Sequence, residues 1–147
     1  MGIQPASSRS STVAAEFRDL LDEVLTETDA DDQAGPLLQA AGLRIRFDFP
    51  DLPLVLSLAA TEKGDHHLEW RFSDSVDWNP KLTLRMDSKV ANAYLQGKES
   101  LAIAIAHGRV QASGDTRSAL VYIPAMRFLV SSYRRLVTQE HPHLVLE

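Results

Sequence analysis

The five histidines are the residues whose chemistry would matter most if they met in space, because imidazole is both a metal ligand and a general acid or base near neutral pH. His66 and His67 are adjacent beside a turn, so on a strand they would point to opposite faces and could not chelate one ion together. His141 and His143 lie close to the end of the chain, and His107 stands alone near the end of an expected helix. We therefore expect exposed histidines and no metal site, with His107 as a favourable cation at a helix C-terminus.

The acidic residues do not form a recognisable ion site or catalytic pair either. The stretch 29–35, DADDQAG, is similar to the start of a calcium loop, but its glycine comes one position late, and Ala40 stands where a glutamate is required. Asp87 and Asp115 each follow an expected strand and are well placed to cap the next helix. The chain has no cysteine, and it has neither a phosphate loop nor a nucleophile elbow. We expect no catalytic residue, no metal and no cofactor.

Composition narrows the classes of function further. The chain has 147 residues and a formal net charge of −5, which favours a single domain and makes nucleic acid a poor candidate partner. No apolar run approaches the length of a membrane span, and the N-terminus lacks the apolar core of a signal peptide. We expect a cytoplasmic protein with a disordered stretch over 1–11, one domain over 12–140 and a tail over 141–147.

Alternating apolar residues predict the strands. The period is two over 43–49, 52–58, 68–72 and 82–86, and RVQAS at 109–113 adds a short strand. Strands with one apolar face each indicate a largely antiparallel sheet that is exposed to water on one side. The apolar side therefore needs a cover.

Three segments with helical spacing can supply this cover. The first is an amphipathic stripe over 13–26, the second covers 88–97, and the third covers 116–137. A short helix over 36–41 precedes the first strand. Pro124 lies inside the third segment and predicts a break near Tyr122, which makes this segment the expected gate of any internal cavity.

The run LAIAIA at 101–106 is ambiguous by itself, because a short apolar run fits either a buried strand or a buried helix. Its flanks favour a helix: Glu99 suits the first turn, and Gly108 suits the left-handed position after the last turn. A helix that is apolar on every side would have to be buried.

The order of these elements resembles the sterol carrier protein family of the nonspecific lipid-transfer type. A strand ends in MD, a helix ends in YLQGK, a short apolar helix ends in HG, and RVQASGD opens the last helix. The match covers roughly 43–137, and its residues are Asp87, Gly97, Lys98, Gly108, Arg109, Val110, Gly114 and Asp115. The resemblance implies an α+β fold, with a five-stranded, mostly antiparallel sheet, helices packed on one face and an enclosed apolar tunnel. It also implies that LAIAIA is a helix.

The function that the resemblance implies is non-catalytic binding or transfer of an apolar lipid, such as a sterol, a fatty acid or an acyl chain. Large flexible or aromatic groups suit an adaptable apolar pocket, although the same groups also fill ordinary cores. The expected cavity residues are Trp70, Phe72, Leu84, Met86, Tyr94, Leu101, Ile105, Met126, Leu129, Val130 and Tyr133. The expected partner is a lipid or sterol-like molecule, with no nucleic acid and no stable membrane insertion. The alternative is an accessory interaction module of the same fold with a filled core, serving a lipid- or steroid-metabolising enzyme.

Overall fold

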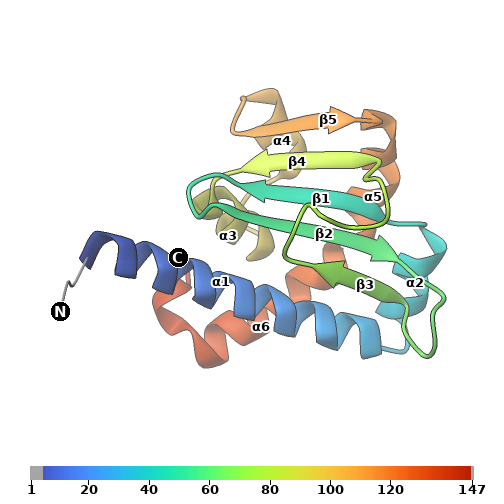
Figure 1. The fold of residues 1–147 in the computed structure, drawn as a ribbon, viewed down its shortest axis with the longest axis horizontal. Helices are drawn as coiled ribbons and strands as arrows, with labels where there is room; N and C mark the ends of the chain where they lie inside the picture. The colour runs from blue at the N-terminus through green and yellow to red at the C-terminus, as the bar shows by residue number, and fades with distance from the viewer. Residues whose placement is uncertain (1–4, 147) are drawn as a thin grey trace.

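A single mixed sheet forms one layer of the protein (Figure 1). The computed structural model describes the backbone of residues 5–146 and the side chains of residues 13–146. The strands are β1 (Arg44–Phe49), β2 (Leu54–Ala60), β3 (Leu68–Arg71), β4 (Leu82–Met86) and β5 (Val110–Gly114). Their order in the sheet is β3-β2-β1-β4-β5. Three of the neighbouring pairs are antiparallel, as predicted, while β1 and β4 are parallel.

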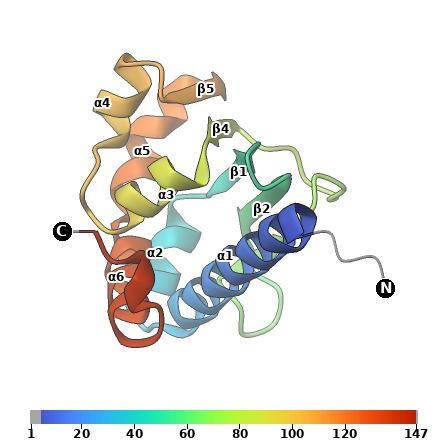
Figure 2. The same ribbon diagram turned by 90° about the vertical axis from the view of Figure 1, so that its left-hand side faces the viewer.

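The helices form the second layer and cover one face of the sheet (Figure 2). They are α1 (Pro5–Ala30), α2 (Ala34–Ala40), α3 (Ser88–Leu95), α4 (Leu101–Ala106), α5 (Ala119–Ala125) and α6 (Arg127–Glu140), with short 3-10 turns η1 (Thr116–Ser118) and η2 (Pro142–Leu144). Helices α1 and α6 pack against each other. In the described part of the chain, residues 5–146, no helix is both long and apolar enough to cross a bilayer.

The register of the sheet explains why its covered face is apolar. Ile45 of β1 is paired with Leu58 of β2 and with Leu82 of β4, and Phe47 is likewise paired with apolar residues on both sides. Since side chains alternate along a strand, these residues share one face. The stripe on α1 closes over them, and Leu20 of that stripe is only 1% exposed. This face and stripe form the core.

Two helices differ from their sequence predictions in extent. Helix α1 begins at Pro5, inside the stretch that was expected to be disordered, and residues 1–4 lie outside the described residues. The segment 116–137 is divided into η1, α5 and α6, so a break exists but lies after Pro124. Proline removes a backbone donor, and α5 ends at Ala125, the residue after it.

The run LAIAIA is a helix, as its flanks indicated. Ser100 caps α4 by accepting a hydrogen bond from the N–H of Ile103, and Gly108 has a φ of +76°. The expectation that the whole run is buried was wrong. Leu101 and Ala104 are buried, but Ile103 is 54% exposed, because α4 packs beside β5 at the end of the sheet.

The cap of α3 also differs from its prediction. Asp87 occupies the N-cap position but makes no side-chain cap hydrogen bond. The Ser88 N–H instead donates to Asp51 Oδ1 at 2.9 Å, and the Ser88 hydroxyl donates to Asp51 Oδ2 at 2.6 Å. A residue from the β1–β2 connection therefore holds the start of α3. Asp115 does act as predicted, since its side chain accepts from the Arg117 N–H at the start of η1.

Candidate apolar ligand site

A small apolar cavity lies between the sheet and helices α1, α3 and α6. Its volume is about 30 Å³, room for about two water molecules. The lining is wholly apolar apart from one tyrosine, so the space is better suited to hydrocarbon than to water. We call it the inner cavity, and its lining residues are Leu21, Val24, Leu25, Phe47, Phe49, Leu56, Leu58, Met86, Ala91, Tyr94, Leu95 and Leu129.

A second, larger cavity of about 140 Å³ is formed by the preceding turns of α1 and α3 and by the chain's C-terminal segment. Its lining mixes apolar, polar and charged side chains. We call it the outer cavity, and its lining residues are Val13, Glu16, Phe17, Leu52, Ser88, Lys89, Asn92, Tyr133 and Leu144.

Phe17 stands between the two cavities. Its ring packs edge to face on Phe49, which lines the inner cavity, with centroids 5.1 Å apart. It also packs edge to face on Tyr133, which lines the outer cavity, at 6.5 Å. Such contacts add to the apolar burial of Phe17, which is only 6% exposed. Phe17 therefore contacts the walls of both cavities.

Electrostatics differ between the cavities. At the inner cavity, burial raises the pKa of Tyr94 to about 12, so its hydroxyl stays neutral. At the outer cavity, burial by itself would raise the pKa of Glu16, but hydrogen bonds from His143 and His141 outweigh it and lower this pKa. Burial also raises the pKa of Tyr133, whose hydroxyl donates to Asn92 Oδ1 at 2.7 Å. The inner cavity is therefore neutral, while the outer one carries an ionised carboxylate.

The structure brings four of the expected cavity residues to these spaces. Met86, Tyr94 and Leu129 line the inner cavity, and Tyr133 lines the outer cavity. The continuous tunnel that they were expected to line stays a prediction.

The other expected cavity residues lie elsewhere in the core or near the edge of the sheet. Leu84, Leu101 and Met126 are fully buried, and Phe72, Ile105 and Val130 are half-buried against the core. Trp70 is half-buried on β3, where its indole N–H donates to Asp22 Oδ1 at 2.8 Å. Their role in ligand binding remains a prediction.

Sequence reasoning missed the contribution of α1 and of the two central strands. Leu21, Val24 and Leu25 were recognised as one helical stripe, and Phe47 and Leu56 as members of alternating strands. These periodicities therefore indicated that the residues lie between the sheet and the helices. They could not show which covered residues surround an empty space.

Several solved structures share this architecture at low sequence identity. The apo form of sterol carrier protein 2 from Yarrowia lipolytica has a TM-score of 0.57 and 13% identity, over 81% of this chain and 93% of that protein. The ubiquinone synthesis protein UbiJ-SCP2 has a TM-score of 0.53 and 17% identity, over 80% of this chain and 96% of that one. This chain has the sterol carrier protein fold. The family resemblance seen in its ordered turns is thereby confirmed at the level of the fold.

A part of one larger protein is also similar to this chain in structure. The stereoselective inverting sec-alkylsulfatase of a Pseudomonas species matches 65% of this chain with a TM-score of 0.50 and 18% identity. The chain spans only 13% of the length of that protein. No family model matches the sequence, and no curated protein is similar to it.

Proposed function

We propose that this protein binds an apolar ligand, such as an acyl chain or a sterol, in the layer between its sheet and its helices, and that it does so without catalysis. The observation that carries the proposal is the inner cavity, an apolar space at the centre of a fold shared with sterol carrier protein 2. The apolar ring of Phe17 separates it from an outer cavity that lies beside the C-terminal segment.

The ligand-free inner cavity must grow before it can hold such a molecule. Ligand pockets measure roughly 300–1,000 Å³, so the space has to expand about tenfold. Each buried methylene contributes about 0.8 kcal/mol, and losing the packing of a buried phenylalanine costs about 3–5 kcal/mol. About four to six buried methylenes therefore offset the displacement of Phe17. Long chains are expected to bind, and short ones are not.

The route for the ligand runs past α1 rather than past the segment 116–137 that was expected to act as a gate. Only α6 of that segment contributes to the two cavities, through Leu129 and Tyr133. The outer cavity is bordered by Glu16 and Phe17 of α1 and by Leu144 of η2. Movement of α1 relative to η2 is the step that widens the mouth.

Native mass spectrometry tests this proposal directly. The protein is incubated with a long-chain fatty acid, a sterol and a polyprenyl quinone, with a four-carbon acid as the polar control. At least one long ligand is expected to form a one-to-one complex, and the short acid is not. Absence of every complex would contradict apolar-ligand binding and leave the interaction module as the alternative function.

A matched pair of variants locates the ligand. Ala91→Val adds volume beside the inner cavity, while Ala104→Val makes the same change at another buried helical alanine, which lines neither cavity. Weaker binding is expected for Ala91→Val only. Equal effects of the two changes would show that the ligand lies outside the inner cavity.

A further inference from the structure

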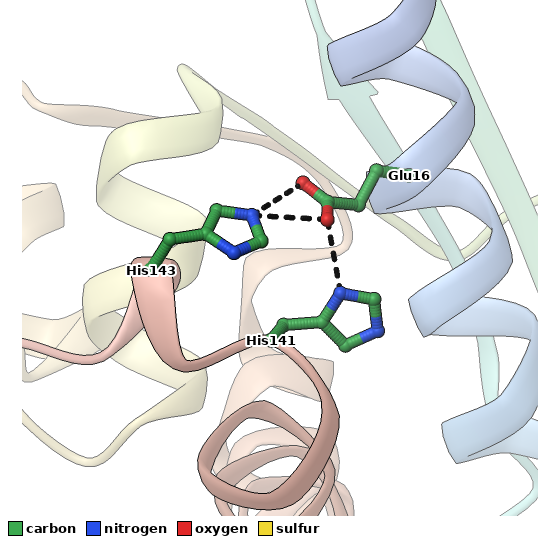
Figure 3. A group of neighbouring side chains, drawn as sticks. All are labelled: Glu16, His141 and His143. Atoms are coloured by element: carbon green, nitrogen blue, oxygen red, sulfur yellow. Dashed lines mark hydrogen bonds and ion pairs between the residues drawn. The ribbon is translucent and has the colours of Figure 1, made fainter.

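The C-terminal segment brings two imidazoles onto one carboxylate of α1 (Figure 3). His141 Nδ1 lies 2.9 Å from Glu16 Oε2, and His143 Nε2 lies 3.0 Å from both Glu16 oxygens. The three candidate ligand atoms all lie within 4.8 Å of one another. More than a hundred residues of chain separate Glu16 from the two histidines, so only the fold could reveal this cluster.

We propose that Glu16, His141 and His143 form a binding site for a divalent transition metal ion, with Zn²⁺ as the ion that fits best. Imidazole nitrogen and carboxylate oxygen are ordinary zinc ligands, and two histidines with one carboxylate leave a fourth position open. Zinc bonds to these ligands are about 2.0–2.2 Å long, so neighbouring ligand atoms of a tetrahedral site lie roughly 3.3 Å apart. The observed Glu–His separations of 2.9 and 3.0 Å are close to this value, and the two imidazole nitrogens lie within 4.8 Å of each other.

The geometry does not depend on the attraction between the histidines and the glutamate. Asn92 of α3 and Gln96, which caps the C-terminus of that helix, donate side-chain hydrogen bonds to the Leu144 carbonyl, at 3.1 and 2.7 Å. The N–H of Leu146 donates to Gln96 Oε1 at 2.9 Å. These contacts fix the segment at Leu144 and Leu146, directly after the two histidines, and so hold the end of η2 against α3. The ligands are therefore largely positioned before an ion arrives.

The surroundings suit an exchangeable fourth ligand. Glu16 lines the outer cavity, which has room for water next to the open position. His143 is exposed, while Glu16 and His141 are each half-buried, so an ion can reach the site from solvent. The bound ion would join α1 to η2 across the mouth of the outer cavity. This inference does not rest on apolar-ligand binding, since the three side chains alone define it.

Metal titration of protein without a histidine tag tests the site. Isothermal titration with Zn²⁺ is expected to show one ion per chain, and Co²⁺ is expected to give the absorption bands of a tetrahedral complex. Glu16→Gln and His143→Ala are each expected to weaken Zn²⁺ binding by more than the roughly 10–100-fold loss that removal of an outer-shell partner causes. His107→Ala removes an exposed histidine at the end of α4 and is the matched control.

The outcomes separate a metal site from a set of hydrogen bonds. Circular dichroism and thermal unfolding of each variant without metal establish that it is folded. Zn²⁺ is expected to raise the melting temperature of the parent protein and of His107→Ala, but not of His143→Ala. Failure of the parent protein to bind Zn²⁺, or equal binding by the parent, Glu16→Gln and His143→Ala, would overturn the proposal.

Discussion

Side chains of α1 are described over residues 13–30, and the two ends of this part, around Glu16 and around Asp29, face histidine pairs in different ways. We call them the Glu16 end and the Asp29 end. Near its C-terminus, Asp29 Oδ1 accepts the backbone N–H groups of His67 and Leu68 at 2.6 and 2.9 Å, and Oδ2 lies 2.6 Å from His66 Nδ1. Thirteen residues earlier in the helix, the Glu16 carboxylate is contacted by imidazole nitrogens rather than by backbone groups. The first carboxylate ties the helix to the start of β3, whereas the second meets two side chains of the C-terminal segment.

This difference assigns different roles to the two ends. A carboxylate at a helix C-terminus is opposed by the helix dipole. Asp29 nevertheless accepts two backbone N–H groups that would otherwise lack a partner. The Asp29 end is a structural anchor. The Glu16 end borders the outer cavity and Phe17, so it is the end that moves in the proposed route of the ligand. We expect substitutions at the two ends to separate stability from binding.

The largest effect on stability is expected from Phe17→Ala. It removes a buried ring and its contacts with Phe49 and Tyr133, so the free energy of unfolding should fall by about 3–4 kcal/mol in urea titrations. Affinity for a long apolar chain should rise, because the wall between the cavities is gone. Leu38→Ala is the control, since Leu38 is fully buried on α2 and lines neither cavity. Equal affinities of these two variants would show that Phe17 does not lie on the route of the ligand.

Asp29→Ala should have the next largest effect and lower the free energy of unfolding by about 2–3 kcal/mol. The change leaves the backbone N–H groups of His67 and Leu68 without their acceptor. Affinity for the apolar chain should stay within twofold of the parent. Asp32→Ala, an exposed acid close by, should change the free energy of unfolding by less than about 0.5 kcal/mol. A large change in affinity with Asp29→Ala would erase the distinction between the two ends.

The anchor should also show in the pH dependence of stability. Burial would raise the pKa of Asp29, but hydrogen bonds from His66 and from two backbone N–H groups outweigh it and lower this pKa. The contribution of ionised Asp29 to the free energy of unfolding is therefore complete above pH 3.8, the ordinary pKa of the group. It is lost as pH falls through the lowered pKa. The hydrogen bond to Asp29 raises the pKa of His66. The contribution of protonated His66 to stability is therefore complete below pH 6.5 and is lost as pH rises through the raised pKa.

Urea unfolding from pH 3 to 8 measures these slopes. Asp29→Asn keeps the shape of the side chain but removes the charge, so its stability should fall less steeply at both ends of the range. Parallel profiles for the parent and Asp29→Asn would show that the pair does not influence stability.

The smallest effect is expected at the other end of α1. Without metal, Glu16→Ala should change the free energy of unfolding by less than about 0.5 kcal/mol, as is usual for a partly exposed ion pair. With Zn²⁺ present, the parent protein should gain stability that Glu16→Ala does not. A loss above 2 kcal/mol without metal would instead make Glu16 a second structural anchor.

Local patterns in the sequence predicted the elements of the fold well. Alternation at Ile45 and Phe47 indicated a strand, and Gly108 marked the end of a helix that its apolar centre could not define. The pairing of β1 with β4 is parallel, which alternation does not reveal, because it fixes the face of a strand but not its direction. Ile103 was expected to be buried because the run around it is wholly apolar. Composition alone cannot show that α4 lies at the edge of the layer, where Ile103 is exposed.

The candidate sites depend on distances that a sequence does not contain. Met86, Tyr94 and Leu129 were expected at the cavity because they are large and apolar, but the same criterion also selected Leu84, which packs solidly in the core. No residue type distinguishes a cavity wall from core filler. Glu16 was not among the expected site residues, and its meeting with His141 and His143 follows from the docking of η2 beside α1.

Amide hydrogen exchange along α1, with and without a saturating long-chain fatty acid, tests most directly whether the interior takes up an apolar ligand at the Glu16 end. Uptake of the ligand at the Glu16 end predicts a change in protection around Val13–Leu21, which includes Phe17 and borders the outer cavity, and none around Asp29. Unchanged exchange over the whole of α1 on saturation, or a change confined to the Asp29 end, would contradict it.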